Sequence, residues 1–523
     1  MKKSYSLIIL LAMLILFSQP AFAQFPSIFT RDFDLDFNTF YGFGQYYSEA
    51  LSFNTPGGGA RAAGMGGAFL GLARGEMAYS WNPAAMIYTD RTKIGVDFLS
   101  KADKYQGVYV EHRWWDPVNS AISSFELDMS HLSLNYGGFS APFSLDSDSD
   151  ARFLAAAALP LSLIPMITSP SEDLQLAVGG GYRHVFDLES EADIPGFDNR
   201  KTTFKQNRSV DAVSLGAATR IAEGIGFGWN MNAYVRGSEA NIVAENIWLW
   251  TFEVGENRID SLVVGAMRRE KSTYSGFSMD FGLSADFEMI KAGAVLHSPY
   301  TLFQNMITIR NSTYPYDIGA IDRVNVKYKM PMSASFGLAI TPIENLAFAF
   351  DFDYRPLSEA KIAVDWEQIF IEEMYNKDEN AGWEDVNQYR MGAEYYIDAG
   401  FANIPLRVGF RNEPSVVREL HNADWNVTFY SDPGDVYYDS LIIVADSTFG
   451  DQAVTNIISF GTGMEFEKIW FNIAYQFGSS TYDRSVTYVF SPDNGTTTID
   501  VHDRTYEIKR EYSELFFSIG MYF

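Results

Sequence analysis

Residues that commonly carry chemistry are sparse in this 523-residue chain. It contains no G-x-S-x-G, no H-E-x-x-H and no G-K-[ST], so the nucleophile elbow, the zinc pair and the phosphate-loop lysine are all missing. Six histidines lie along the chain without metal-ligand spacing: His112, His131, His184, His297, His421 and His502. We therefore expect neither enzyme activity nor a metal or cofactor. A lipase that pairs one of these histidines with a serine ranks third among the alternatives.

One acidic stretch has the spacing that opens a calcium loop. Asp146, Asp148 and Asp150 alternate as in an EF-hand. However, Ala151 stands where the loop needs glycine, and Ala157 stands where it needs the bidentate glutamate. The stretch is therefore interpreted as a solvated loop.

The overall charge and the missing cysteines exclude two classes of protein. The chain carries 39 Lys and Arg against 66 Asp and Glu, a net charge of −27. Nucleic acid is a poor partner for that balance, because affinity for it depends on neutralising phosphates. With 0 Cys, the fold must also hold together without disulfides.

The first 23 residues are typical of a secretory signal. Lys2 and Lys3 precede the apolar run 7–17, and Ala21-Phe22-Ala23 fits a cleavage site. No later segment reads as a transmembrane helix, since prolines interrupt the longest apolar run, 153–167. An exported chain that is 15% aromatic is then either a large soluble β protein or a transmembrane β-barrel.

Alternation and repetition favour the barrel. In residues 277–287, "FSMDFGLSADF", the large apolar side chains share one face and the small or acidic ones share the other. Similar runs recur as hairpins joined alternately by short and long links. We predict an all-β fold, a transmembrane antiparallel barrel of fourteen strands over residues 92–523. The predicted strands are 92–100, 153–164, 174–187, 207–221, 225–236, 272–287, 291–298, 329–340, 346–355, 386–398, 404–412, 453–466, 469–480 and 508–523.

Two further segments, 105–113 and 127–139, also look like strands and would make sixteen. We place them in a long first extracellular excursion.

The last strand, "FFSIGMYF", supports the barrel independently. Phe517, Ile519, Met521 and Phe523 share one face, and the chain ends on an aromatic residue. Such a strand resembles the signal that barrel-assembly machinery reads in outer-membrane proteins, so that machinery and outer-membrane lipids are expected partners.

A glycine-rich apolar stretch precedes the barrel. "ARAAGMGGAF" (60–69) and "AYSWNPAAM" (78–86), followed by the strand "RTKIGVDFL", resemble the N-terminal hatch of the FadL/TodX family of outer-membrane transporters for hydrophobic compounds. The resemblance implies that residues 24–91 are an N-terminal extension and a hatch inside the barrel. The expected hatch residues are Gly64, Gly66, Gly67, Asn82, Pro83 and Ala84.

Elementary conformational preferences suit that role. Glycines allow positive φ and close backbone approach in a narrow lumen. Pro83 fixes φ and moves Asn82 away from helix, while the Asn82 side chain can bond its own backbone. Residues 24–55 are longer than the corresponding segment of the family, and their role stays open.

Two other segments acquire roles from the resemblance. In the family the third strand kinks and opens a gap in the wall, and here that strand contains Gly179, Gly180 and Gly181. Close packing against the hatch is the equally weighted alternative.

The family's third loop forms an apolar docking groove. The loop matching it contains "NIWLWTF". We expect ligand docking by Ile247, Trp248, Leu249, Trp250 and Phe252. The alternative is that these residues pack on neighbouring loops or extend the barrel as strands.

The leading functional prediction is a monomeric channel of the bacterial outer membrane for passive uptake of small or medium hydrophobic molecules. Ligand would dock on the loops, move past the hatch and leave sideways through the wall. The rival is an interaction protein like the outer-membrane shuttle of type IX secretion, which binds protein cargo. An apolar pocket beneath the hatch would favour transport, and a polar lumen would favour cargo handling.

Overall fold

The computed structural model describes residues 57–111, 121–128, 130–145, 174–187, 190–195, 201–207, 209–235, 239–249, 253–254, 257–258, 262–312, 320–366, 379–380, 383–416, 419–428, 440–449, 452–491 and 500–523. The predicted signal peptide, the N-terminal extension 24–55 and the acidic stretch at 146–150 lie outside these residues.

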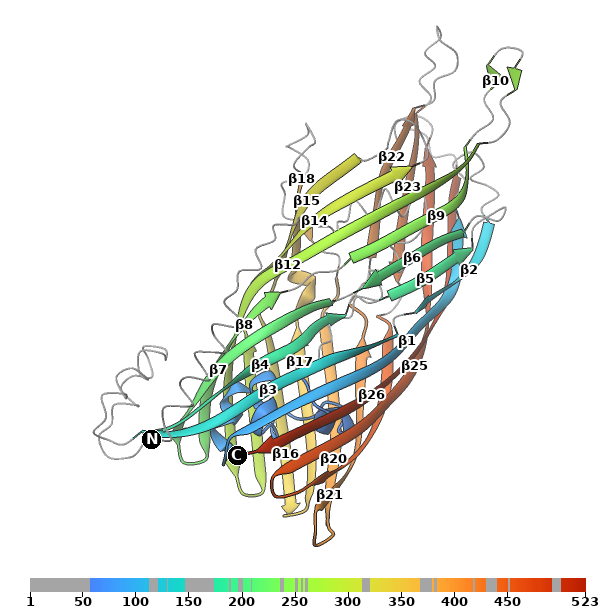
Figure 1. Cartoon of the computed structure of the whole chain (residues 1–523). Helices are drawn as coiled ribbons and strands as arrows, with labels where there is room; N and C mark the ends of the chain where they lie inside the picture. The colour runs from blue at the N-terminus through green and yellow to red at the C-terminus, as the bar shows by residue number, and fades with distance from the viewer. Residues whose placement is uncertain are drawn as a thin grey trace.

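Fourteen antiparallel strands form one closed ring (Figure 1). The ring closes because β1 pairs with β26, from Lys93 opposite Tyr522 to Gly107 opposite Ile508. In order around the ring the strands are β1 (Lys93–Glu111), β3 (His131–Leu145), β4 (Leu174–Asp187), β7 (Ser209–Ala222), β8 (Ile225–Val235), β12 (Leu262–Phe287), β13 (Ile290–His297), β16 (Ser333–Ile343), β17 (Leu346–Arg355), β20 (Val386–Asp398), β21 (Asn403–Pro414), β24 (Val454–Glu465), β25 (Ile469–Ser491) and β26 (Asp500–Tyr522).

The two faces of the wall have opposite polarity. On β12, Phe277, Leu283 and Phe287 are about half exposed on the outer face, whereas Ser278 and Asp280 are buried. The same alternation recurs along the other strands, with large apolar side chains outside and polar ones inside. This is the pattern of a barrel whose outer face meets lipid, so the predicted transmembrane barrel is confirmed.

Short turns join the strands at one end of the barrel, which we call the turn end. They include the link at Gly224 (φ +70°) and the link at Gly400 (φ +80°), where glycine supplies the left-handed backbone. At the opposite end, the loop end, ten strands continue or extend the wall: β2 (Ala121–Asp128), β5 (Ser190–Pro195), β6 (Lys201–Asn207), β9 (Glu239–Leu249), β14 (Tyr300–Ser312), β15 (Ala320–Met330), β18 (Lys361–Trp366), β19 (Glu379–Asn380), β22 (Glu419–Thr428) and β23 (Ser440–Phe449).

A separate two-stranded sheet, β10 (Glu253–Val254) with β11 (Asn257–Arg258), lies at the loop end (Figure 1). In the part of the chain that the structure describes, no helix has the length and apolar character needed to cross a membrane.

The second strand of the ring differs from the sequence prediction. The ring uses β3, which pairs with β1 on one side and β4 on the other. The predicted strand 153–164 lies outside the described residues, and β3 fills the place predicted for it. Residues 105–111 are the upper part of β1, and 131–139 belong to β3, so placing them in an extracellular excursion was wrong. Each of the other predicted ranges overlaps a strand of the ring, although the range 329–340 begins in β15 and several strands are longer than predicted.

Irregularity within β3 explains the error. The β1–β3 register shifts between Asp97 and Phe98. Outward side chains consequently change parity, from Leu132 and Leu134 on one side of the shift to Phe143 on the other. A bulge of this kind interrupts the two-residue period on which strand prediction relies.

Candidate functional site: the hatch and the lumen

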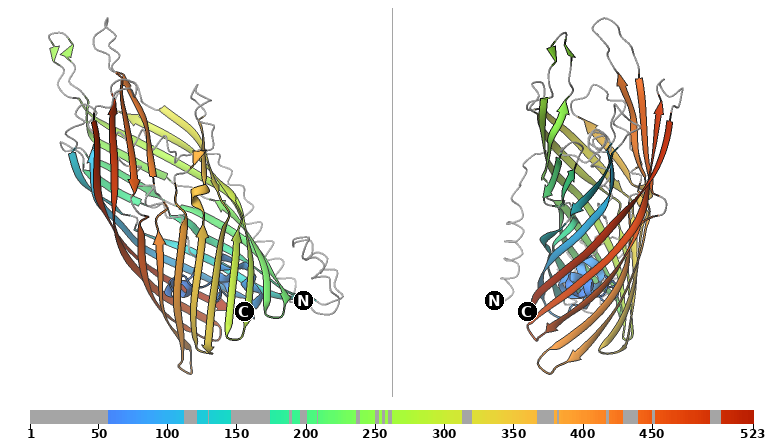
Figure 2. Two further views of the ribbon diagram at one scale, coloured as in Figure 1. Left: turned by 180° about the vertical axis from the view of Figure 1, so that it is seen from behind. Right: turned by 90° about the vertical axis from the view of Figure 1, so that its right-hand side faces the viewer.

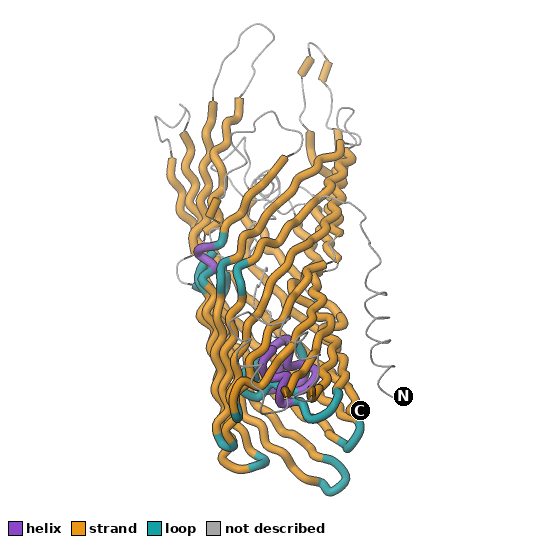
Figure 3. The backbone as a smooth tube through the Cα atoms, turned by 90° about the vertical axis from the view of Figure 1, so that its left-hand side faces the viewer, coloured by secondary structure: helices purple, strands orange, loops and turns teal. Residues whose placement is uncertain are grey.

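Residues 57–91 fold into a compact hatch inside the lumen near the turn end. The hatch consists of α4 (Ala60–Gly64), η1 (Gly75–Met77), α5 (Ala78–Trp81) and η2 (Pro83–Tyr88). Figure 3 shows these helices in purple, enclosed by the lower part of the wall, and both views of Figure 2 agree. Their apolar side chains form one buried cluster with inward wall residues such as Tyr136 and Ala339. The predicted plug is therefore present in the structure.

The first hatch residues are bound at the seam between the first and last strands. The Gly59 amide donates to the Asp97 carboxylate at 3.4 Å, and the Ala60 amide donates to the Ser518 hydroxyl at 2.7 Å. Asp97 on β1 lies directly opposite Ser518 on β26. The Ser518 hydroxyl in turn donates to Asp97 at 2.5 Å. The seam therefore supplies the acceptors for the orphan amides that begin α4.

Other wall residues hold the middle and the end of the hatch. Asp351 accepts the amides of Phe69 (2.6 Å) and Leu70 (2.8 Å) through one carboxylate oxygen. The Tyr88 hydroxyl donates to the Gly224 carbonyl at 2.7 Å. Because these bonds reach strands on opposite sides of the ring, the hatch is tied across the whole lumen.

Ion pairs reinforce this attachment. Arg61 of α4 makes two hydrogen bonds to Glu394 on β20, at 2.7 and 3.0 Å. Arg407 on β21 donates to the same carboxylate at 2.6 Å and to Asn472 at 2.7 Å. Glu394 is thus shared between a hatch arginine and a wall arginine, and all three side chains are largely buried. Removing one partner would leave buried charge uncompensated.

The Asn82-Pro83-Ala84 turn has the conformation that the sequence predicted. Asn82 is extended (φ −147°) and fully buried, and its side-chain oxygen accepts the Ala84 amide at 3.1 Å. Its side-chain nitrogen donates to the Leu283 carbonyl of β12 at 2.9 Å. Pro83 begins η2. The asparagine therefore both caps the short helix and fastens it to the wall.

Two of the three predicted hatch glycines need positive φ. Gly66 has a φ of +68° and Gly67 a φ of +81°. In addition, a Cβ on Gly66 would lie 2.6 Å from the Phe410 amide nitrogen of β21. Gly64 is helical, and its Cβ would lie 3.0 Å from the Gly461 Cα of β24. At all three positions glycine lets the hatch backbone approach the wall directly.

The hatch buries one carboxyl group without an ion pair in the described part of the chain. Glu76 of η1 is 3% exposed, and burial raises its pKa from 4.5 to about 7, although Lys93 and Arg61 act in the opposite direction. The Tyr136 hydroxyl donates to its backbone carbonyl. Glu76 is therefore a proton-binding group in the neutral range, and no local sequence pattern indicates this property.

The wall is closed at the glycines of β4. Gly179, Gly180 and Gly181 pair with 138–140 on β3 and with 214–216 on β7, without interruption. A Cβ on Gly179 would lie 2.7 Å from the Met86 sulfur, and one on Gly181 would lie 2.6 Å from the Tyr79 hydroxyl. This structure therefore has no gap at these residues, contrary to the family-derived expectation. Gly179 and Gly181 instead make room for hatch side chains, which was the alternative interpretation, whereas a Cβ on Gly180 would meet the Ser214 carbonyl of β7.

The predicted docking segment is partly described. Ile247, Trp248 and Leu249 belong to β9 and pair with β12, so their backbone extends the wall at the loop end. Trp250 and Phe252 lie outside the described residues. A docking role for this segment stays a prediction.

A cavity of about 130 Å³ lies directly above the hatch. Hatch residues, among them Leu70 and Trp81, form its floor. Its apolar wall includes Tyr234, Tyr300 and Met330, and the rings of Tyr234 and Tyr300 stack with centroids 5.1 Å apart. An apolar cavity of roughly 150 Å³ holds a single benzene molecule, so this cavity has the size for one small ring.

Charged side chains line the rest of the cavity: Arg183, Asp280, His297, Asp353, Arg355 and Arg390. Asp280 pairs with His297 at 2.7 Å, and Asp353 is shared by Arg355 and Arg390. Arg183 forms no ion pair with any described residue, and its buried Nε has no hydrogen-bond partner. Three arginines therefore face two carboxylates, which leaves an excess of positive charge beside the aromatic rings.

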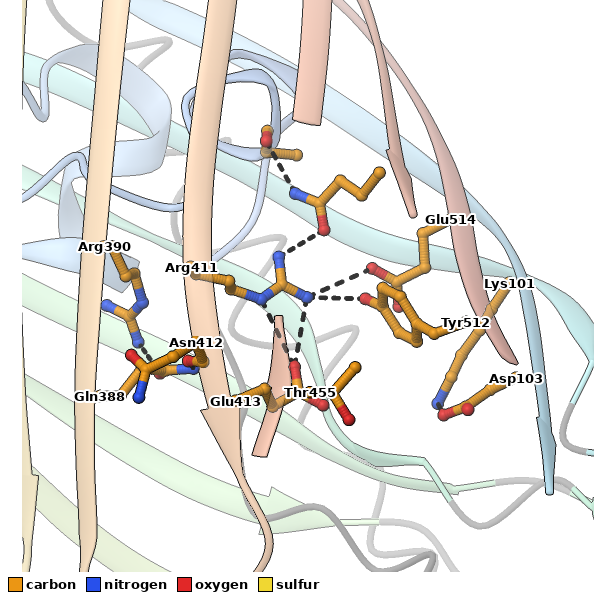
Figure 4. A network of polar contacts seen from close by, with 12 residues as sticks. Lys101, Asp103, Gln388, Arg390, Arg411, Asn412, Glu413, Thr455, Tyr512 and Glu514 are labelled. Carbon is orange, nitrogen blue, oxygen red and sulfur yellow. Dashed lines mark hydrogen bonds and ion pairs between the residues drawn. The ribbon is translucent and has the colours of Figure 1, made fainter. Parts of the chain in front are cut away.

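A second polar network crosses the lumen near β21 and β26 (Figure 4). Arg411 donates to Tyr512 at 2.7 Å and also to Gln476, whose amide holds the Ala63 carbonyl of the hatch at 2.7 Å. Arg510 makes two bonds to Asp103, at 2.8 and 2.7 Å. The lumen is thus polar and charged rather than apolar. Through Gln476, this network of hydrogen bonds also contacts the hatch.

None of the cavity or network residues was nominated from the sequence. A usable signal did exist on β21, where Arg407, Arg411 and Glu413 alternate along one buried face and the exposed Leu406 and Val408 lie on the other. Charged residues on the inward face of a barrel strand mark the lumen. The described residues contain no group of three or more His, Asp and Glu side chains that could hold a metal ion.

No family model and no curated protein matches this chain. Among solved structures, it is similar to a FadL homologue from Pseudomonas aeruginosa, with a TM-score of 0.53 at 11% identity, over 90% of this chain and 99% of that one. The toluene transporters TodX of P. putida (TM-score 0.46, 13% identity, 90% and 99% covered) and TbuX of Ralstonia pickettii (0.47, 12%, 90% and 100%) also match. At such low identity the first likeness establishes the fold. The chain therefore has the fold of a FadL-type barrel, a closed ring of strands around an N-terminal hatch.

Proposed function

We propose that this chain is a passive outer-membrane channel for small molecules that combine an apolar ring or short chain with an anionic group. The observation that carries the proposal is the cavity above the hatch, where stacked tyrosines lie beside the unpaired Arg183. An arginine without a carboxylate partner favours a ligand that brings its own anionic group. The volume of about 130 Å³ favours a single ring rather than a long chain.

In this proposal ligand enters from the loop end and rests on the hatch. Residues 247–252 remain the candidate docking segment. The hatch closes the route beneath the cavity and must move or unfold locally for ligand to pass. An exit through Gly179–Gly181 is not part of the proposal, because the ladder is continuous there.

A second candidate is an interaction protein that handles protein cargo. The polar lumen favours it, since networks such as that of Arg411 and Arg510 replace the apolar channel that a hydrocarbon would need. The small cavity, with its stacked tyrosines, favours the first candidate. A protein cargo would contact the loop end and would leave the cavity empty.

Calorimetric titration of the detergent-solubilised barrel tests the first candidate. We expect benzoate to bind more tightly than toluene, because only benzoate can pair with Arg183. Arg183→Met should weaken benzoate binding roughly tenfold, in line with the loss of one charge-assisted hydrogen bond. Arg220→Met is the matched control, since Arg220 is exposed near the turn end of β7. Equal affinity of wild type and Arg183→Met for benzoate would contradict the assignment.

A further inference from the structure

Three inward side chains on neighbouring strands of the wall are connected to one another beside the cavity. Asp280 of β12 lies directly opposite His297 of β13, and Ser335 lies two residues along β16 from Ser333, the register partner of His297. All of them line the cavity above the hatch. The Asp280 Oδ1 is 2.7 Å from the His297 Nδ1, and the His297 Nε2 is 3.3 Å from the Ser335 Oγ. Carboxylate, imidazole and hydroxyl are therefore connected in the order of an Asp–His–Ser triad.

The imidazole is oriented for proton transfer. Because the carboxylate lies at Nδ1, the neutral ring carries its proton there and presents the Nε2 lone pair to the Ser335 hydroxyl. The carboxylate is itself fixed, since the Asn232 side-chain amide donates at 2.8 Å to its other oxygen. Asn232 in turn accepts the Ser214 hydroxyl at 2.7 Å. Both oxygens of Asp280 are thus occupied, which holds His297 in one orientation. A distance of 3.3 Å from base to nucleophile is within the range of catalytic pairs that have no substrate bound.

One other carboxylate competes for the hydroxyl proton of Ser335. Asp353 of β17 lies opposite Ser335 in the register, and its carboxylate also interacts with that hydroxyl. However, Asp353 is held by Arg355 at 2.9 Å and by Arg390, so two guanidinium charges face its single charge. Positive charge close to a carboxylate makes it a weaker base. The His297 Nε2 is therefore the stronger base within reach of the Ser335 hydroxyl.

The arginines of the cavity supply positive charge where a reaction at Ser335 would develop negative charge. Attack on a carbonyl group creates an oxyanion beside the nucleophile, and donors that are already in place lower the barrier. Arg355 and Arg390 line the cavity and are bound to the carboxylate opposite Ser335. Arg183 lines the same cavity. The site therefore combines a nucleophile, a base with its positioning carboxylate, and cationic donors.

We propose that this cavity hydrolyses small carboxylic esters, with Ser335 as the nucleophile, His297 as the general base and Asp280 as the residue that positions the base. The volume of about 130 Å³ keeps the substrate small, on the order of one ring. The stacked rings of Tyr234 and Tyr300 favour an aryl ester. The inference uses the cavity of the proposed function but not its preference for anions, so the two proposals can fail separately.

The sequence alone did not indicate this arrangement, and we expected no enzyme. The three residues come from three strands, so no local motif such as G-x-S-x-G surrounds the serine. A triad is defined by geometry and not by position in the chain. Only the register of β12, β13 and β16 brings the three side chains together.

Hydrolysis takes two steps. In the first, the Ser335 oxygen attacks the ester carbonyl carbon while its proton passes to the His297 Nε2. The carbon–oxygen bond to the alcohol then breaks, and the alcohol leaves with the proton from His297. In the second step a water molecule, the co-reactant, gives a proton to His297 as its oxygen attacks the acyl-serine. The bond to the Ser335 oxygen breaks, the proton returns to that oxygen, and the carboxylic acid is released.

Two measurements on the detergent-solubilised barrel test the activity. The first is covalent labelling by a small fluorophosphonate, which transfers its phosphonyl group to an activated serine with loss of fluoride; mass spectrometry locates the label. The second is release of 4-nitrophenol from 4-nitrophenyl acetate. Ser335→Ala removes the nucleophile. Ser333→Ala is the matched control, because Ser333 lines the same cavity from the same face of β16. Heat-modifiable migration on gels confirms that each variant is folded.

We expect the label on Ser335 in wild type. Ser335→Ala should lose the label and at least roughly a hundredfold of the hydrolysis, and His297→Gln should lose a similar factor of the hydrolysis. Asp280→Asn should lower kcat with little change in KM, because Asp280 positions the base without contacting the substrate. Ser333→Ala should keep both the label and the activity.

Equal hydrolysis by wild type and Ser335→Ala would overturn the triad, as would a label on another residue. Equal losses in Ser335→Ala and Ser333→Ala would also overturn it, because the polarity of the cavity would then matter instead of one nucleophile. Labelling and hydrolysis that depend on Ser335 in a protein that does not bind benzoate would support the triad and refute only the proposed preference for anionic ligands.

Discussion

We call the hatch seated when it occupies its observed position in the lumen and unseated when it has left that position. The equilibrium between the two forms should depend on pH through Glu76. Burial raises the pKa of this carboxyl from 4.5 to about 7 in the seated hatch, whereas an unseated hatch would expose it to water. The seated form therefore binds the proton more tightly. The free energy by which protonation of Glu76 favours the seated form is fully present below about pH 4.5 and is lost as the pH rises towards 7. At roughly 1.4 kcal/mol for each pH unit, this difference amounts to between about 3 and 4 kcal/mol, or on the order of a 300-fold change in the seating equilibrium.

Three charged groups around Glu76 belong to other elements: Lys93 on β1, Arg61 on α4 and Glu465 on β24. The substitution Glu76→Gln keeps the size of the side chain and removes only its titration. A thiol at Ala73, which is fully buried in the hatch, reports unseating through its rate of modification by a maleimide.

The Ala73→Cys protein is measured from pH 5.5 to pH 8, both with Glu76 intact and with the additional substitution Glu76→Gln. The ratio of the two modification rates at each pH cancels the intrinsic chemistry of the thiol. We expect the protein that keeps Glu76 to become relatively more reactive as the pH rises, by a factor of tens or more, with a plateau above about pH 7. A ratio that does not vary with pH would refute the reasoning, because Glu76 would then keep the same environment when the hatch moves.

The hatch yields two further predictions. Deletion of residues 59–88 should leave a folded barrel whose conductance in planar bilayers rises, because the ring of strands closes without them; unchanged conductance would contradict the plug. Gly66→Ala should destabilise the seated hatch by about 1–3 kcal/mol in thermal unfolding, since φ is +68° and the new Cβ would lie 2.6 Å from the Phe410 amide nitrogen. Gly400→Ala is its control, with a similar φ of +80° and no atom within 4 Å, and should show only the smaller strain; equal losses in the two variants would refute the close approach.

Alternating side chains made the strands of the wall predictable from sequence. The prediction of strand positions failed where an irregular backbone interrupts that alternation. On β12 and β26 the outward residues keep one parity throughout, so their strands and faces were found. On β3 the parity changes at a bulge, and the more apolar run 153–164 was chosen in its place. The same limit applies at 298–299, where an interruption looks like a strand end although the chain continues as β14.

The hatch and the lumen differ in how much their sequences reveal. Glycines and an Asn-Pro step have local conformational meaning, so Gly66 and Asn82 could be assigned before any contact was known. Arg183 acquires its character from the absence of an ion-paired carboxylate among the described residues, although Asp280 lines the same cavity. Which strands lie side by side, and at what register, decides that absence, and neither is encoded in the local pattern of β4.

The position of the hatch anchor at the seam has a consequence for biogenesis. Asp97 and Ser518 belong to the first and last strands, more than 400 residues apart, and meet only when the ring closes. Before that moment the amides of Gly59 and Ala60 lack their acceptor pair, so the first turn of the hatch cannot take its final position until the ring closes. Fixation of the N-terminal end of the hatch is thereby placed after closure of the wall.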